Sequence, residues 1–234
     1  MYRIIGVFAD ENGDSHVKLI KYTQLGAYKW HSDNTRDVDW ADSDLYNGLN
    51  GSYFLTNTTY SYMQDNTWLN KITDWKWTAV NTKTYDGSSG PNYYNSLSPS
   101  NIYLHEMNRS NKTSTIGEWT TPTAKIGLMY ASDYALSLGS TALAMTTGTS
   151  SNASTLKTGW LHQSNNDTTA STDEWTISRV GANGFTFYAR CVGSDGTLGL
   201  NYVTLTYGAR PVLYLESDIS GSGEGTLENP IMLN

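Results

Sequence analysis

The sequence of 234 residues contains a single cysteine, Cys191, and only five prolines. One cysteine excludes a disulfide framework within this chain and any zinc site built from several cysteines. Charged residues make up 16% of the chain, below the roughly 25% of an ordinary globular protein. No run of apolar residues approaches the roughly 20 that a membrane-spanning helix requires, so we expect no membrane insertion by this segment.

Basic residues are scarce as well, since 15 Lys and Arg stand against 22 Asp and Glu, which gives a net charge of −7. Recognition of nucleic acid requires clustered Lys and Arg, so we expect no nucleic-acid partner. The sequence has no phosphate-binding glycine loop, and its four histidines never occur as a His-x-His pair or at helical i, i+4 spacing. We therefore expect no cofactor and no catalytic constellation, and we leave the question of a metal open.

Two remaining features could carry chemistry. Cys191 is predicted to lie in the middle of a strand, where a thiol is usually buried and inert, because reactive thiols require exposure and a nearby positive group. The densest acidic stretch, residues 33–44, matches no calcium-loop spacing and is predicted to be a solvated loop. Neither feature predicts an enzyme.

Hydroxyl and amide side chains take the place of the missing charges. The chain has 25 serines, 30 threonines and 20 asparagines, together about a third of its residues, and 17 tyrosines and 8 tryptophans. So many aromatics argue against a disordered chain. Tyrosine and tryptophan offer rigid contact area, while Asn, Ser and Thr offer adaptable hydrogen bonds. This composition is typical of secreted or wall-associated bacterial domains and favours a binding surface.

Local patterns predict the elements of the first two thirds of the chain. β-rich residues at 2–8 and alternating apolar and polar residues at 16–22, joined by the turn residues at 11–14, predict a β-hairpin. Asp42 or Ser43 can cap a short helix whose apolar face holds Leu45 and Leu49. Further strands are predicted at 75–80 and 125–130, and a helix is predicted at 131–136 with Ser132 or Asp133 as its cap.

The last third of the sequence is predominantly β. Strands are predicted at 174–178, 185–192 and 208–216, with a turn at 193–196 that contains the hairpin dipeptide Asp-Gly. Pro211 predicts that the strand at 208–216 lies at a sheet edge or a bulge. Strands mixed irregularly with short helices and long loops predict an α+β fold, and we expect one domain over residues 1–234.

Four segments, in chain order, resemble a known group. They lie at 40–51, 125–134, 208–215 and 223–230, and the segment Ile-Gly-Leu-Met-Tyr-Ala-Ser-Asp-Tyr at 126–134 is the most specific. This series resembles the C-type-lectin-like, formylglycine-generating-enzyme-like domains of bacterial surface, pilin-associated and phage proteins. The resemblance implies a C-type-lectin-like fold, with a twisted antiparallel sheet, two short helices and long loops.

The resemblance also implies a ligand face. Some members of the group are variable proteins of diversity-generating retroelements, and the segment 178–207 resembles their variable region. The ligand-facing positions would then be Arg179, Asn183, Phe185, Tyr188, Arg190, Asn201, Tyr202, Thr204 and Tyr207. The competing interpretation is that alternate members of the strand around Phe185, Tyr188 and Cys191 belong to the core.

The chain departs from two better-known relatives of this group. It lacks the Glu-Pro-Asn and Trp-Asn-Asp calcium motifs and the disulfides of sugar-binding animal lectins. It shares Gly-Ala-Arg at 208–210 with the formylglycine-generating oxidases but lacks their paired cysteines. These departures argue against calcium-dependent sugar binding and against oxidase chemistry.

Our leading hypothesis is a non-enzymatic, extracellular recognition or adhesion domain. It would be displayed on a bacterial surface, a pilus or a phage, as a monomeric domain of a larger protein, and would bind a protein or glycan ligand. The first alternative is a structural pilin-like or cell-wall subunit whose aromatic faces pack against neighbouring subunits. The second is an enzyme, either a formylglycine-generating-type oxidase or a glycan hydrolase.

Overall fold

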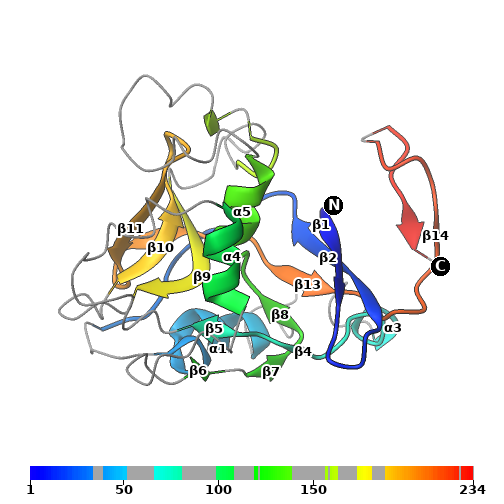
Figure 1. Ribbon diagram of the computed structural model, residues 1–234, viewed down its shortest axis with the longest axis horizontal. Coiled ribbons are helices and arrows are strands. Elements are labelled where there is room, and N and C mark those ends of the chain that lie inside the picture. The colour runs from blue at the N-terminus through cyan, green and yellow to red at the C-terminus, as the bar shows by residue number, and fades with distance from the viewer. Residues whose placement is uncertain are drawn as a thin grey trace.

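The computed structural model is an α+β protein with two main sheets and short helices (Figure 1). It describes residues 1–33, 39–51, 66–80, 99–107, 119–120, 122–138, 156–157, 159–162, 173–180, 188–226 and 228–233. None of the helices in these ranges is long and apolar enough to cross a membrane.

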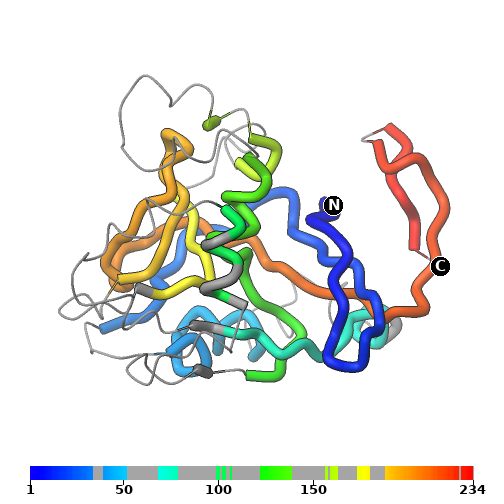
Figure 2. The backbone as a smooth tube through the Cα atoms, in the orientation of Figure 1, coloured from blue at the N-terminus to red at the C-terminus, as the bar shows by residue number. Residues whose placement is uncertain are grey.

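The first sheet joins the two ends of the chain. Its order is β1-β2-β13-β8, and every pair in it is antiparallel. The four strands are β1 (Tyr2–Ala9), β2 (Ser15–Lys21), β13 (Val212–Tyr214) and β8 (Ile126–Gly127). The predicted hairpin is therefore confirmed, and Figure 2 shows its blue strands running beside the orange C-terminal segment.

The expectation for the strand at 208–216 is wrong. Residues 208 and 212–214 belong to different sheets, and β13 lies between β2 and β8 instead of at an edge. Pro211 is tolerated because it immediately precedes β13, where its missing N–H removes no bond from the ladder. Its carbonyl still accepts a hydrogen bond from the Lys21 amide at 2.9 Å.

The second sheet has the order β11-β10-β9-β12-β3, so β11 and β3 are its edge strands. The five strands are β11 (Leu198–Tyr202), β10 (Tyr188–Val192), β9 (Glu174–Val180), β12 (Thr206–Gly208) and β3 (Ala27–Lys29). β12 runs parallel to β9, and the other pairs are antiparallel. The predicted turn between β10 and β11 is confirmed, with Gly196 at a φ of +83°.

The predicted helix after Asp42 is confirmed as α1 (Asp44–Asn50). A 3-10 helix, η1 (Trp40–Asp42), precedes α1. The Ser43 hydroxyl caps α1 by accepting a hydrogen bond from the Tyr46 amide at 3.0 Å, and Leu45 and Leu49 are buried as expected. The capping hydroxyl and the spacing of the two leucines are therefore sufficient local signals for this helix.

The second predicted helix is also present, as α5 (Ala131–Ser137). The predicted cap is wrong, because Tyr130 is the N-cap residue and Ser132 and Asp133 lie within the helix; the Asp133 carboxylate accepts a hydrogen bond from the Tyr130 amide at 2.7 Å. Helix α4 (Pro99–Met107), which the sequence patterns do not predict, packs against α5, and the Ser178 hydroxyl on β9 donates a hydrogen bond to Glu106 of α4 (Figure 1). A further helical turn, α3, spans Asn66–Leu69.

The remaining strands form three short pairs. They are β4 (Trp75–Lys76) with β7 (Thr123–Ala124), β5 (Ala79–Val80) with β6 (Trp119–Thr120), and β14 (Gly221–Ser222) with β15 (Met232–Leu233). The strand predicted at 75–80 is thus two short strands, and only residues 126–127 of the strand predicted at 125–130 are extended in a sheet.

Tryptophan fills the core. Trp30, Trp40, Trp77 and Trp175 are fully buried, and the rings of Trp30 and Trp40 lie 5.7 Å apart. Buried indole N–H groups need acceptors, and those of Trp30, Trp77 and Trp175 donate to backbone carbonyls, with Trp175 donating to Tyr28 at 2.8 Å. The buried hydrophobic residues form one cluster that extends from Leu19 to Leu215. Residues of both main sheets and of helices α1 and α5 contribute to this core, which therefore packs these elements together.

Candidate functional site

Two of the predicted ligand-facing residues, Tyr188 and Tyr202, form a pair on the surface of the five-stranded sheet. They are register partners on β10 and β11, and their ring centroids lie 4.5 Å apart at an interplanar angle of 36°. Tyr202 is 42% exposed. A hydrogen bond with Tyr202 raises the pKa of Tyr188. The pair therefore presents two aromatic rings with hydrogen-bonded hydroxyls at the edge of the sheet that β11 forms.

Three other predicted positions, Thr204, Asn201 and Tyr207, do not belong to this pair. Thr204 lies in the turn after β11, which is closed by a 2.9 Å hydrogen bond from the Leu205 amide to the Tyr202 carbonyl. Asn201 alternates with Tyr202 along β11 and so points to the opposite face, where its side chain contacts the Cys191 thiol. Tyr207 packs on Trp175 with ring centroids 4.6 Å apart, and burial raises its pKa to about 12.

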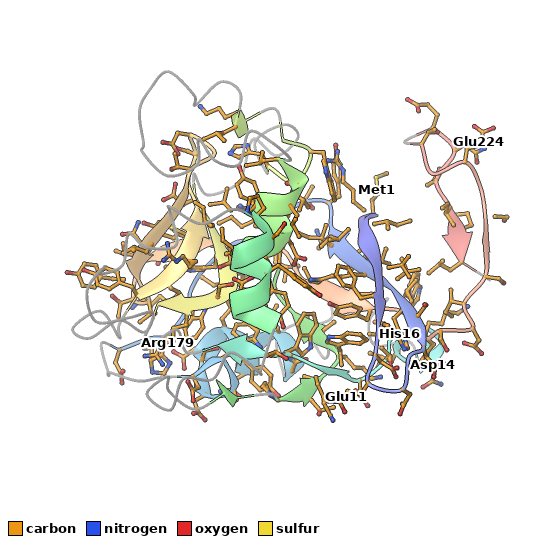
Figure 3. The ribbon with its side chains drawn as sticks, in the orientation of Figure 1. Met1, Glu11, Asp14, His16, Arg179 and Glu224 are labelled. Atoms are coloured by element: carbon orange, nitrogen blue, oxygen red, sulfur yellow. The ribbon has the colours of Figure 1, made fainter. Side chains whose placement is uncertain are left out.

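Two predicted positions are buried. Arg179 and Arg190 are only 3% and 2% exposed, which differs from the expectation that they face a ligand. Nη1 of Arg179 lies 3.6 Å from Asp39 Oδ1, so this guanidinium forms an ion pair within the protein (Figure 3). A buried guanidinium must be paired to offset its desolvation, and Asp39 provides that pairing for Arg179. The last two positions, Asn183 and Phe185, lie outside the described residues.

The surroundings of Cys191 do not favour a reactive, nucleophilic thiol. The side chain is 2% exposed, and burial raises the pKa of its thiol to about 12. A thiol with so high a pKa is almost entirely protonated at neutral pH and is a poor nucleophile.

The structure also contains a buried polar cluster that the sequence patterns do not reveal. Lys18, on β2, places Nζ 2.5 Å from Asp133 Oδ2, and both side chains are buried. Its ammonium group lies 4.7 Å from the centroid of the Tyr130 ring, within reach of a cation–π contact. Burial lowers the pKa of Lys18, because the charged form loses its hydration.

Glu106 extends this cluster from α4. One carboxylate oxygen accepts a hydrogen bond from the Ser132 amide at 2.9 Å, and the other accepts from the Ser178 hydroxyl. Burial raises the pKa of Glu106 to about 7. The carboxylate therefore ties α4 to α5 and β9, and its 1% exposure indicates a structural role.

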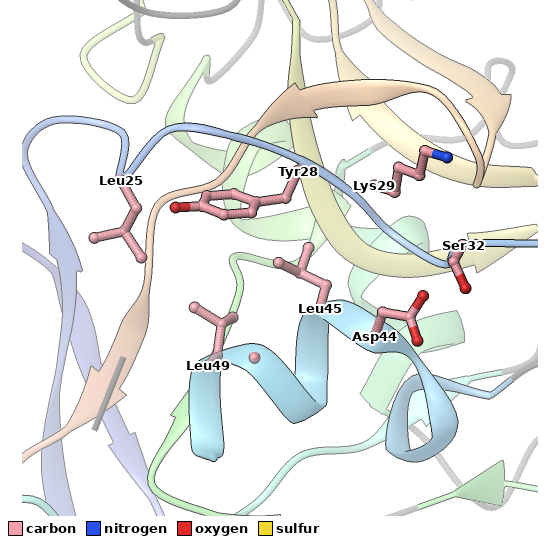
Figure 4. Close-up of a pocket in the computed structure, with 8 residues that line it drawn as sticks. Leu25, Tyr28, Lys29, Ser32, Asp44, Leu45 and Leu49 are labelled. Atoms are coloured by element: carbon pink, nitrogen blue, oxygen red, sulfur yellow. The ribbon is translucent and has the colours of Figure 1, made fainter. Parts of the chain in front are cut away.

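A groove lies between edge strand β3 and helix α1 (Figure 4). β3 and β11 form the two opposite edges of the five-stranded sheet. Its volume is about 240 Å³, and the side chains of Leu25, Tyr28, Leu45 and Leu49 point into it. Gly48 also lines the groove, so no side chain fills this part of the α1 wall. The resulting cavity has an almost wholly apolar wall.

One end of this groove carries charged and polar side chains. Lys29, Ser32 and Asp44 line it there. His31 lies beside this end, with Nδ1 3.7 Å from Asp44 Oδ1 and Nε2 3.3 Å from Asp33 Oδ1. The carboxylates remain accessible, since the side chains of Asp33 and Asp44 are 62% and 47% exposed. The groove is thus apolar along its length and acidic at its rim.

In the part of the chain that the structure describes, no three His, Cys, Asp or Glu side chains gather into a possible metal site. Comparison of the chain with protein-family models, with curated proteins and with solved structures found no match.

Proposed function

We propose that this chain is a non-enzymatic recognition domain with a C-type-lectin-like fold, displayed outside a bacterial cell or on a phage. It binds a protein or glycan ligand through the Tyr188–Tyr202 pair. The observation that carries the proposal is the hydrogen-bonded pair of the half-buried Tyr188 and the exposed Tyr202 on two paired strands of the five-stranded sheet.

The chemistry of the pair suits recognition. A tyrosine ring supplies a large contact area at a low entropic cost, and its hydroxyl supplies a hydrogen bond at the same place. Because β10 pairs with both β9 and β11, the backbone under Tyr188 is held on two sides. A ligand would therefore meet a preformed surface and would not have to order a loop.

Two observations support the fold proposal. The segments that resemble C-type-lectin-like domains include β8 with α5 and β13, and these elements lie within the core. The β1-β2-β13-β8 sheet is wholly antiparallel, and the resemblance implies an antiparallel sheet. If residues 178–207 are diversified, we expect variation at Tyr188, Tyr202 and Thr204 and not at the buried Arg179 and Arg190.

The test is capture of ligand by the purified chain from a glycan array and from a lysate of bacterial surface proteins. Tyr188→Ala combined with Tyr202→Ala should abolish capture and leave the thermal midpoint nearly unchanged, because Tyr202 is 42% exposed. Met232→Ala, at a side chain that is 65% exposed on β15, is the matched control and should capture normally. Undiminished capture by the double variant would refute a role for this face.

One observation favours the structural alternative of a self-assembling subunit. The edge strand β1 exposes Ile4 and Val7 by 49% and 63%, and exposed apolar edge strands promote association between copies. Size-exclusion chromatography and cross-linking at increasing concentration distinguish the two functions. A recognition domain stays monomeric, whereas a subunit assembles and loses assembly when Val7 is replaced by Lys.

A further inference from the structure

The groove between β3 and α1 is remote from the tyrosine pair. β3 and β11 are the two edge strands of the five-stranded sheet, with β12, β9 and β10 between them. The groove is therefore a second candidate surface, and an argument for its ligand has to come from its own geometry.

The size and lining of the groove restrict its ligand. A cavity of about 240 Å³ is smaller than the roughly 300–1,000 Å³ of typical small-molecule pockets, so it suits one or two side chains. Tyr28 and Leu45 on opposite walls give these side chains an apolar environment. A sugar would lose the hydration of its hydroxyl groups against such walls and find few acceptors, which costs free energy. The lining favours aliphatic or aromatic side chains over a glycan.

The strand beside the groove can also bind backbone. β3 pairs with β12 along one side, and no other described strand pairs with its second side. The unpaired side of an edge strand presents N–H and C=O groups that can accept an added strand. Extended peptides are recognised in this way, with main-chain hydrogen bonds for affinity and pockets for alternate side chains. An extended segment next to β3 would place alternate side chains toward α1.

The acidic side chains at the end of the groove favour a ligand with a basic side chain. The accessible carboxylates of Asp33 and Asp44 lie on either side of His31, and they outnumber the single ammonium group of Lys29 at this end. The whole chain carries a net charge of −7, which attracts basic partners further. A Lys or Arg on the ligand would meet complementary charge here.

We propose that the groove between β3 and α1 binds an extended, basic segment of a partner protein. The segment adds to the edge of β3, inserts apolar side chains between Tyr28 and α1, and places a Lys or Arg beside Asp44. This site is independent of the tyrosine pair and gives the domain a second contact with polypeptide.

The probe is a fluorescein-labelled, amidated peptide, Lys-Thr-Leu-Thr-Leu-Thr-Lys, titrated into the full chain at low salt and followed by fluorescence anisotropy. We expect a Kd of roughly 10–100 µM, the affinity of a short extended peptide. A probe with Glu in place of both Lys should bind at least about ten-fold more weakly. A probe N-methylated at its Leu amides, which cannot donate to a strand, should lose a similar factor.

Two variants test the site within the protein. Gly48→Phe fills the groove from the α1 wall and should weaken binding at least about ten-fold, whereas Gly48→Ala adds one methyl group and should bind more tightly than the Phe variant. Asp44→Lys should weaken binding of the Lys probe and strengthen binding of the Glu probe. Leu136→Ala, at a 47% exposed position on α5, is the control and should not change the Kd.

Thermal melts of each variant separate loss of binding from loss of folding. The proposal is overturned if the Lys probe does not bind the chain at millimolar concentration. It is equally overturned if folded Gly48→Phe and Asp44→Lys variants bind the probe as the parent does, or if chitotetraose displaces the peptide, which would assign the groove to a glycan.

Discussion

Lys18 and Asp133 form an ion pair inside the protein, with Nζ 2.5 Å from Oδ2 and side-chain exposures of 0% and 5%. The pair joins β2 of the N-terminal hairpin to α5, which lies in the middle of the sequence. Charges removed from water in this way are stable only together, since either one alone would retain its desolvation penalty. This pair therefore links the stability of distant elements.

Replacing Lys18 by Met should lower the free energy of unfolding by about 3–5 kcal/mol, because Asp133 would remain as an unpaired buried charge. Urea unfolding followed by tryptophan fluorescence measures this loss. Adding Asp133→Asn should recover part of it, because the amide oxygen can still accept the hydrogen bond from Tyr130. Strictly additive losses in the two single variants and the double variant would contradict the coupling.

Stability should fall as the pH rises through the range in which Glu106 titrates. Burial raises its pKa from 4.5 to about 7, so the folded chain holds a proton that the unfolded chain has already lost. The contribution is fully present below pH 4.5 and is lost as the pH rises toward about 7. Burial also raises the pKa of Glu174, which acts in the same direction.

The measurement is the free energy of unfolding of the parent and of Glu106→Gln between pH 4.5 and pH 8. The parent should lose more stability across this range than the glutamine variant, which cannot ionise but can still accept a hydrogen bond at this position. Identical pH profiles for the two proteins would show that Glu106 does not titrate in this range.

Cys191 should not react with Ellman's reagent in the folded protein. Its thiol is buried and its pKa is raised to about 12, so both access and thiolate are lacking at pH 8. Absorbance at 412 nm should remain at baseline in buffer and rise to one thiol per chain in guanidinium chloride. Rapid reaction of the folded chain would reopen the possibility of a catalytic thiol.

Replacing Gly127 by Ala should destabilise the protein by about 1–3 kcal/mol, the usual cost of overpacking. A Cβ at this position would lie 2.5 Å from the Trp77 ring, which is fully buried and cannot move aside freely. Gly199→Ala is the matched control, because the nearest atom to its added Cβ is the Cys191 sulfur at 3.8 Å. Thermal melts should separate the two variants clearly, and equal midpoints would contradict the prediction.

Local signals in the sequence predict local structure well. The hairpin at 2–22, the cap at Ser43 and the turn at 193–196 depend on residues close together in the chain, and all three are confirmed. Helix α4 has no comparable signal, because its hydrophobic face is weak and it contains few helix-forming residues. Its position depends on Glu106, whose partners Ser132 and Ser178 come from distant segments.

In the candidate site, too, the sequence predicts the local features and not those that depend on contacts between distant segments. Strand alternation can indicate that Tyr188 and Tyr202 share a face, because they belong to one hairpin. It cannot show that Arg190 on the same strand is buried, since that depends on which elements cover the sheet. The groove beside β3 is similarly not evident in the sequence, because α1 and β3 are separate segments that tertiary packing brings together.

The central position of β13 has a consequence for the synthesis of this protein. Its two neighbours, β2 and β8, emerge from the ribosome long before it does, and neither of them can complete the sheet without it. Folding must therefore wait for almost the entire chain, and the apolar surface of the early hairpin stays accessible to chaperones during translation. A message truncated before the codon for Val212 should yield an insoluble product, not a smaller stable one.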